Sequence, residues 1–276
     1  ALQRMGLQAA RVGMELGENE RLGLPYHDLR SLLRANPALS LADAGPLVQG
    51  LRAVKSAYEI DALRAACDLS LKAWNAALAR FPVGATNDEI TRIVGTELAA
   101  AGSDPNIAGH VTVGNGVAGI EPYRPGEVIW CDFGGVVRGY QADLARRAVY
   151  GTPTEQHLEV HAQISDVFEA ELAAIGPGVR ASEVARAVSD RLEALGHPPL
   201  GPRKRVGHGL GLGAAEPPSL SLADDTVLQP GMVLTPEPRF TLANGEKVHI
   251  EEVVVVTETG CERLTDGATR LHVIEG

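Results

Sequence analysis

Five side chains that could bind metal ions interrupt apolar or glycine-rich stretches from residue 132 onward. They are Asp132, Asp143, His208, Glu237 and Glu251. A buried carboxylate without a partner is strongly destabilising, so each acid needs a cation, a donor network or a proton. A salt bridge or a helix cap could serve one acid, but this many such groups in one chain favour a pair of divalent cations that neutralises them together.

Carboxylates with a single imidazole form a hard, oxygen-rich ligand set. Such a set favours Mn²⁺, Co²⁺, Fe²⁺ or Zn²⁺ over metal ions that prefer thiolates. Two ions bridged by carboxylates can hold a hydroxide between them as a nucleophile and can polarise a carbonyl group. The residue types therefore predict a dinuclear metal centre with a water-derived nucleophile.

The first two acids bracket the stretch DFGGVVRGYQAD, from Asp132 to Asp143, which has the turn-rich composition of a β-hairpin. With a turn around residues 136–138, the two aspartates would lie opposite each other on neighbouring strands. Side chains paired in this way are about 5 Å apart, a distance at which two carboxylate oxygens can bridge one metal centre.

Helical patterns occur in two pairs along the chain. Apolar residues at helical spacing predict a helix over residues 56–80, which begins with a capping box formed by Ser56 and Glu59. Three further helices are predicted: 87–101, with Thr86 as the N-cap; 154–175; and 181–195, beginning at Ser182.

Strand patterns follow each pair of helices. Short β-branched runs predict strands over residues 110–113, 127–133, 145–150, 232–238 and 247–258. The repeated order predicts an α+β domain over residues 54–276, in which helices lie on the outer face of a curved, mostly antiparallel sheet in two pseudo-repeated halves. Residues 1–53 read as a piece of α/β architecture, and we expect a partial N-terminal domain and a linker there.

Composition excludes several classes of protein. A net charge of −10 disfavours a general nucleic-acid binder, and the basic run Arg203–Arg205 is interpreted as a solvated loop. No apolar run is long enough to span a membrane, and nothing at the start of the sequence argues for export. Three cysteines without CxxC spacing fit buried free thiols in a reducing cytoplasm, with Cys131 facing away from Asp132 as core filler.

The five residues, in this order, resemble the metal ligands of the pita-bread metallopeptidases, a family that includes methionine aminopeptidase, aminopeptidase P, prolidase and the metal-free creatinase. The surrounding stretches DFGGVVRGYQADLARR, GHGLGL, TPEP and HIEEVVVVTETGCERLT are similar to the family's motifs, and the resemblance covers residues 10–276. LRAVKSAYEIDALRAA resembles the segment that joins a creatinase-type N-terminal domain to the catalytic domain of prolidases and aminopeptidases P. It favours these enzymes over methionine aminopeptidases.

The resemblance implies an Xaa-Pro dipeptidase or aminopeptidase with two divalent ions, Mn²⁺ or Co²⁺ before Zn²⁺ or Fe²⁺, and Glu237 as the base that takes a proton from water. It also implies a small peptide or amide substrate and a possible homodimer. Arg146 matches a family arginine expected to pair with a ligand carboxylate. Tyr140 is expected to pack.

Two histidines that bind the substrate and the tetrahedral intermediate in prolidases and aminopeptidases P are absent. The first loop, VGNGVAGIEPYRPGE, is shortened and has no histidine, and Ala215 stands where the second is expected. His249 and Glu216 are the candidate replacements. His110 and Glu121 are further candidates. A structural or surface role is favoured for both histidines, and a helix N-cap or solvent-exposed role for both glutamates.

These departures leave two alternatives open. One is a pita-bread enzyme that acts on a non-peptide small molecule, as a lyase or an amidohydrolase, through a pocket shaped by the altered loops. The other is a catalytically weakened binding homologue, although a binding module has no need of the five metal-binding side chains.

Overall fold

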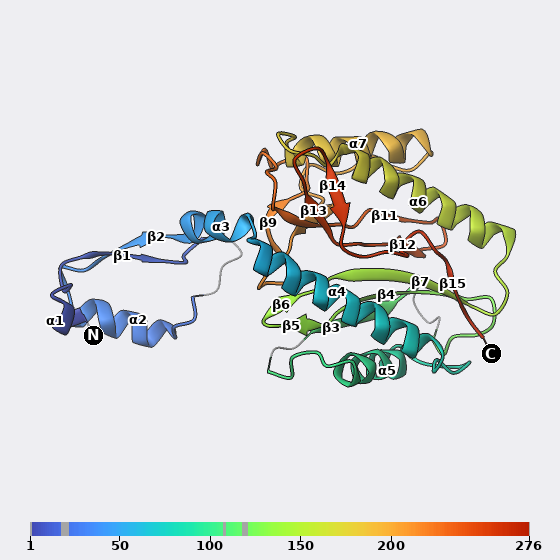
Figure 1. Ribbon diagram of the computed structural model, residues 1–276, viewed down its shortest axis with the longest axis horizontal. Coiled ribbons are helices and arrows are strands. Elements are labelled where there is room, and N and C mark those ends of the chain that lie inside the picture. Colours follow the sequence, from blue (N-terminus) through green and yellow to red (C-terminus); the bar gives the residue numbers. More distant parts are fainter. Residues whose placement is uncertain (1, 18–21, 107–108, 118–120, 276) are drawn as a thin grey trace. The chain divides into compact units, whose positions relative to one another are not determined.

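The computed structural model describes residues 2–17, 22–106, 109–117 and 121–275, which form two compact units, Ala1–Arg52 and Ala53–Gly276 (Figure 1). The first unit contains α1 (Leu2–Met5), β1 (Arg11–Met14), α2 (Tyr26–Ala35), β2 (Ser40–Asp43) and most of α3 (Gly45–Ala53). Strands β1 and β2 pair in parallel on either side of α2 in the sequence. This is an α/β arrangement; its origin in a creatinase-type domain stays a prediction.

Two long helices open the second unit. Helix α4 (Ala57–Leu78) begins at the predicted capping box, in which the Ser56 N–H donates to Glu59 and the Glu59 N–H donates to Ser56. Helix α5 (Asn87–Ala100) begins with the same motif, built on Thr86 as predicted. Both helix starts follow from hydrogen bonds between residues close in sequence, which explains why they could be predicted.

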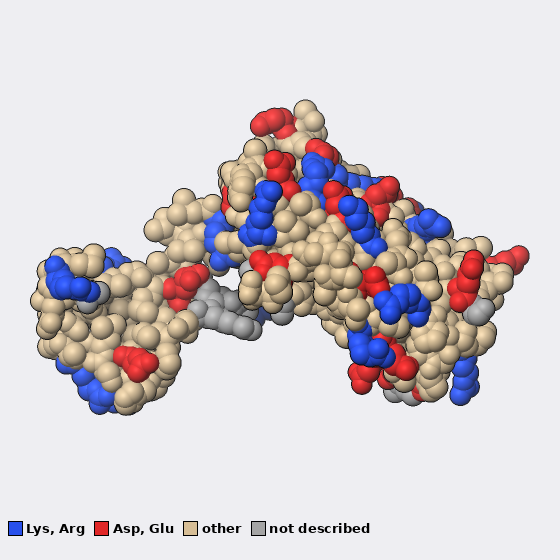
Figure 2. Space-filling model, turned by 60° about the horizontal axis from the view of Figure 1, so that its bottom comes forward, with Lys and Arg blue, Asp and Glu red and all other residues tan. Residues whose placement is uncertain are grey.

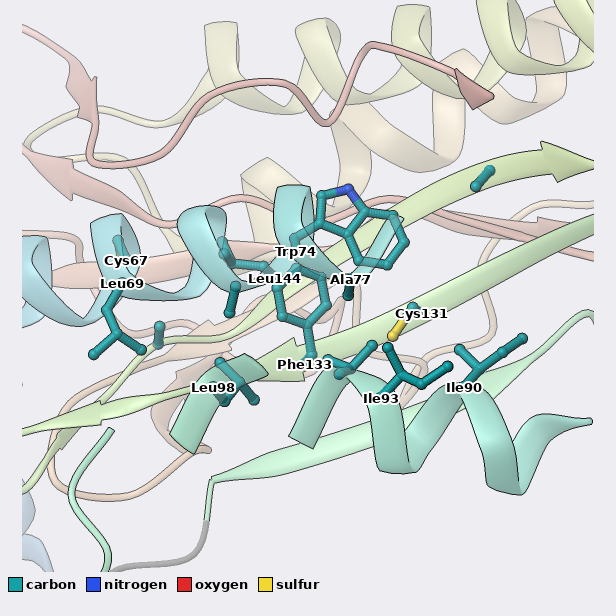
Figure 3. Packing of buried hydrophobic residues seen from close by; sticks show 14 of the residues in the cluster. Cys67, Leu69, Trp74, Ala77, Ile90, Ile93, Leu98, Cys131, Phe133 and Leu144 are labelled. Atoms are coloured by element: carbon teal, nitrogen blue, oxygen red, sulfur yellow. The ribbon is translucent and has the colours of Figure 1, made fainter. Parts of the chain in front are cut away.

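These helices cover a sheet of order β15-β7-β4-β3, formed by β3 (His110–Gly114), β4 (Val128–Gly134), β7 (Leu144–Tyr150) and β15 (His272–Ile274). All its pairings are antiparallel except β15 with β7. Trp74 of α4 stacks on Phe133 of β4 with ring centroids 5.2 Å apart, and Cys131 lies in the same buried cluster (Figure 3). The assignment of Cys131 to the core is therefore confirmed.

The second half repeats this plan. Helices α6 (Glu155–Ala174) and α7 (Ala181–Ala194) pack beside a sheet of order β14-β13-β10-β8-β9, whose strands are Cys261–Arg263, Val254–Val256, Val233–Pro236, Gly207–Gly209 and Glu216–Ser219. A separate buried cluster fills this half. Helix α7 begins after Arg180 and not at Ser182, because Ser182 Oγ donates to Asp225 at 2.6 Å and does not cap the helix.

The hairpin between the first two acids has a different register from the predicted one. Asp132 pairs with Ala145, so Asp143 lies just before β7 and is not opposite Asp132. The chain between them forms a small arm of β5 (Val136–Val137) and β6 (Tyr140–Gln141), which turns at Arg138 and Gly139 with φ of 54° and 85°. A two-residue turn with two positive φ angles suits the twist of a hairpin.

The predicted strand over residues 247–258 is two strands. β12 (Lys247–His249) pairs with β11 (Arg239–Thr241), whereas β13 joins the second sheet. Between them Glu251 makes an isolated antiparallel bridge with Ala145 of β7, with N–H···O distances of 3.2 and 3.3 Å. This bridge attaches a residue of the second half directly to the sheet of the first.

Charged side chains are mixed on the surface. Figure 2 shows acidic and basic groups interspersed over the face that it presents, without a continuous basic stripe. Within the described part of the chain, no helix has both the length and the apolar character needed to cross a membrane.

Candidate metal centre

Potential metal ligands from six residues converge where the two sheets meet. They form three overlapping groups, and within each group the ligand atoms lie within 4.8 Å of one another. The groups are Asp143, His208 and Glu251; Asp132, His249 and Glu251; and His110, Asp132 and Asp143. Each of the three acids belongs to two groups, so the acids lie between the histidines.

His208 is oriented for metal binding by its own backbone. Its Nδ1–H donates to the Gly209 carbonyl at 2.9 Å, which leaves the lone pair of Nε2 directed toward the acids. Nε2 lies 3.6 Å from Asp143 Oδ2 and 4.0 Å from Glu251 Oε1. Burial lowers the pKa of His208, which keeps the ring neutral and able to bind a cation.

Glu251 is the acid with the strongest need of a cation. Its side chain is buried, and Oε1 has no hydrogen-bond partner among the described residues. Burial, followed by the charges of Asp143, Glu237 and Asp132, raises the pKa of Glu251 well above its usual range. A divalent ion among these carboxylates would remove the repulsion, so the residues present fit a metal centre.

Glu237 lies at the edge of this cluster. Its Oε1 is 3.9 Å from His208 Nε2, but it also accepts a hydrogen bond from Arg205 Nε at 3.1 Å, and Oε2 accepts one from Arg239 at 3.0 Å. None of the three ligand groups includes Glu237. Arg203 and Lys204 are exposed, as expected for a solvated loop, whereas Arg205 also reaches Glu237 from this loop before β8.

His110 lies inside the cluster, although the sequence favoured a structural role for it. Because β3 pairs with β4 so that Thr112 faces Asp132, the His110 Nε2 atom lies 2.9 Å from Asp132 Oδ1 and 2.8 Å from Asp143 Oδ1. Burial lowers the pKa of His110, but hydrogen bonds to both aspartates and their charges raise it to about 10. The same contacts lower the pKa of Asp132 despite its burial.

A sequence model of metallopeptidase family M24 matches residues 61–258, a span that includes all five expected ligands. The chain belongs to this family. The Xaa-Pro dipeptidase of Pyrococcus furiosus is 30% identical over 226 residues, covering 79% of this chain and 65% of that protein. The probable dipeptidase PepE of Mycobacterium tuberculosis is 30% identical over 241 residues, covering 84% and 63% respectively. The chain therefore spans less than two thirds of the length of either relative.

Solved M24 structures share the fold. The X-Pro aminopeptidase of Thermotoga maritima superposes with a TM-score of 0.84 at 25% identity, covering 99% of this chain and 77% of that one. The prolidase of Pyrococcus furiosus gives a TM-score of 0.79 at 25% identity, with coverage of 93% and 76%. The predicted α+β pita-bread fold is confirmed.

The two candidate replacements for the missing M24 histidines lie in different surroundings. His249 is fully buried beside Glu251, with Nε2 3.7 Å from Oε2. Glu216 accepts a hydrogen bond from the Gly213 N–H at 2.8 Å and lies 3.6 Å from Lys55 Nζ, contacts that support the glycine-rich turn after β8. The cluster of ligand atoms includes His249 and not Glu216.

Three other expectations concern residues around the M24 site. Arg146 does not pair with a ligand carboxylate; it donates to the backbone carbonyl of Glu251 at 2.7 Å and to the carboxylate of the neighbouring Glu252 at 2.8 Å. Tyr140 packs against the core and also donates to Glu59 at 2.9 Å. Glu121 accepts from the Asn87 N–H at the start of α5; residues 118–120 of the shortened loop lie outside the described residues.

Proposed function

We propose that this protein is a metal-dependent hydrolase of small peptides with proline in the second position, acting through two divalent ions. The names of the M24 relatives support the substrate class. The observation that carries the proposal is the group of Asp143, His208 and Glu251, where a neutral imidazole nitrogen and an unpartnered buried carboxylate oxygen face each other. Bound divalent ions would lower the pKa of water to give a nucleophile and would polarise the peptide carbonyl.

Glu237 is the proposed proton acceptor. Burial raises its pKa, although the neighbouring arginines oppose this effect. A carboxylate with a raised pKa accepts a proton more readily than an exposed one, and Glu237 lies beside His208 at the edge of the ligand cluster.

Arg205 and Arg239 would bind the substrate carboxylate. Their side chains are 41% and 28% exposed while they pair with Glu237, so part of each guanidinium remains open to solvent. Guanidinium groups form strong charge-assisted hydrogen bonds with carboxylates. We therefore favour free dipeptides over longer peptides as substrates.

The test measures metal content and peptide hydrolysis in one preparation. Chelator-treated protein is reloaded with Mn²⁺, Co²⁺ or Zn²⁺ and assayed for release of proline from Xaa-Pro dipeptides, next to a panel of small amides and zwitterions. We expect two bound ions, dipeptide hydrolysis, and a loss of at least about 100-fold in kcat/KM for Asp143→Asn, because charge stabilisation at the reacting carbonyl depends on this residue.

Asp166→Asn is the matched control. Asp166 pairs with Arg191 on the exposed side of α6, so the same change of charge there should leave hydrolysis unaltered. Metal-loaded protein that hydrolyses none of the dipeptides would reject the peptidase. Turnover of an amide or zwitterion in its place would favour the non-peptide alternative.

A further inference from the structure

Two histidines outside the expected ligand set share ligand groups with Asp132. His110 begins β3, which pairs directly with β4, and His249 ends β12. Each forms a three-membered group with Asp132 and one further acid, Asp143 for His110 and Glu251 for His249. Imidazole nitrogens therefore approach Asp132 from two different strands.

The buried ring of His249 lacks hydrogen-bond partners for its two nitrogens among the described residues. This ring is fully buried and lies at 72° to the ring of Trp130, with centroids 5.8 Å apart. Leaving buried polar atoms unpaired is unfavourable, and side chains in such positions are usually bonded to something.

The missing partner of His249 lies on the side of the acids. Its Nε2 is 3.7 Å from Glu251 Oε2, which is too long for a hydrogen bond, and Glu251 Oε1 is itself unpartnered. An imidazole nitrogen and a carboxylate oxygen that face each other without a hydrogen bond would both be satisfied by a cation bound between them.

His110 makes the corresponding approach from β3. One nitrogen, Nε2, lies within 2.9 Å of both Asp132 and Asp143, yet a single N–H can be directed well at only one of them. A metal ion bound to the two aspartates would therefore lie next to this nitrogen. On losing its proton to solvent when the ion binds, Nε2 would serve as a third ligand.

We propose that His110 and His249 are metal ligands, which make the Asp132 end of the centre a mixed nitrogen and oxygen site. This inference rests on the proposed function only in requiring that the protein binds metal. Imidazole favours Co²⁺, Ni²⁺ and Zn²⁺ over Mn²⁺ more strongly than carboxylate does. The centre should therefore discriminate against Mn²⁺ more than one ligated by carboxylates and His208 alone.

The first test uses the unaltered protein. Zn²⁺ is titrated into protein with ¹⁵N-labelled histidine, and ring nitrogen shifts are followed by NMR for the eight histidines of the chain. We expect metal-bound nitrogens at His208, His110 and His249. A ring at either of the last two positions that keeps its metal-free shifts after two ions are bound would overturn the assignment for that residue.

The second test compares metal affinities by calorimetry. His249→Gln should lower the affinity for one of the two Co²⁺ ions by about tenfold or more and the affinity for Mn²⁺ by less, since even indirect contacts to a metal contribute 10–100-fold. His272→Gln is the control, because His272 is also a buried histidine with an unpartnered Nε2 but lies in β15, outside the ligand groups.

The outcomes separate this inference from the proposed function. Wild-type Co²⁺ affinity in correctly folded His249→Gln, together with dipeptide hydrolysis, would reject the histidine ligand and leave the peptidase intact. Failure of the unaltered protein to bind any ion would reject both. If His249→Gln does not fold, the NMR result on the unaltered protein decides.

Discussion

At the scale of single residues, the site is shaped by which charges already have partners. Glu237 contacts two guanidinium groups, and Asp132 and Asp143 share His110. One oxygen of Glu251 has no hydrogen-bond partner in the part of the chain that the structure describes. The need for a cation is therefore concentrated on Glu251, although the sequence suggests five equivalent groups. The arginines at Glu237 allow a separate test of substrate binding.

Arg239→Gln should weaken the binding of free dipeptides. A hydrogen bond between charged groups contributes about 1.5–3 kcal/mol, so we expect KM for an Xaa-Pro dipeptide to rise roughly 10–100-fold. KM for the same dipeptide with an amidated C-terminus should change by less than about threefold, because it has no carboxylate. An equal loss for both substrates would mean that Arg239 only positions Glu237.

Residue types identified the candidate ligands, but not their partners. Asp132, Asp143, His208 and Glu251 stand out because acids and a histidine interrupt apolar strands. The sequence makes His110 only a weak candidate, with a structural role favoured, because its place in the site depends on the pairing of Thr112 with Asp132, which no local pattern specifies. Ion pairs such as Arg205 with Glu237 depend in the same way on the folded chain.

At the scale of elements, the ligands are brought together where the chain passes from one sheet to the other. The chain leaves β12, passes Glu251 beside β7 and enters β13 in the other sheet. Arg146 of β7 is fully buried and supports this crossing through the Glu251 carbonyl, the Glu252 carboxylate and the Asp266 carbonyl. One guanidinium thus fixes the backbone of a ligand.

Arg146→Gln should destabilise the protein by about 3–5 kcal/mol, because it leaves the buried Glu252 carboxylate without its cation. Adding Glu252→Gln should recover part of this loss, since the uncompensated charge is then removed. Urea unfolding of metal-free protein measures both effects. Arg263→Gln, which breaks the exposed pair with Glu169, is the control and should cost less than about 1 kcal/mol.

Local sequence predicted elements better than pairings. The starts of α4 and α5 were predictable because capping boxes use neighbouring residues, whereas the start of α7 was not, since Ser182 bonds to the distant Asp225. Asp132 pairs with Ala145 and not with Asp143, the partner that the sequence predicts, because the β5–β6 arm lies between the two strands. The position of a turn within a glycine-rich stretch sets the pairing of both strands.

At the scale of the whole molecule, each half of the M24 domain has its own buried cluster, and the candidate ligands come from both halves. Outside this centre, His161 and His272 are buried, and burial together with nearby arginines lowers the pKa of each to about 4. The cytoplasmic location and the dimer expected from the resemblance stay predictions.

Acid should destabilise the domain through these two histidines. An unfolded histidine has a pKa near 6.5, so between pH 6.5 and 4 the unfolded chain binds protons that the folded chain does not, and stability falls as the pH falls. Each histidine should contribute up to about 1.4 kcal/mol per pH unit. His272→Gln should therefore lose about 1–2 kcal/mol less than wild type between pH 7 and 5 in urea unfolding. Parallel losses in both proteins would contradict this assignment.

The backbone bridge between Ala145 and Glu251 also bears on how substrate enters. Two backbone hydrogen bonds attach Glu251 to Ala145 in the first half of the domain. A hinge motion that separated the two halves would therefore break these bonds and move the Glu251 carboxylate away from Asp132 and Asp143. We therefore expect substrate to enter and product to leave through movement of surface loops, while the strands that carry the candidate ligands keep their positions.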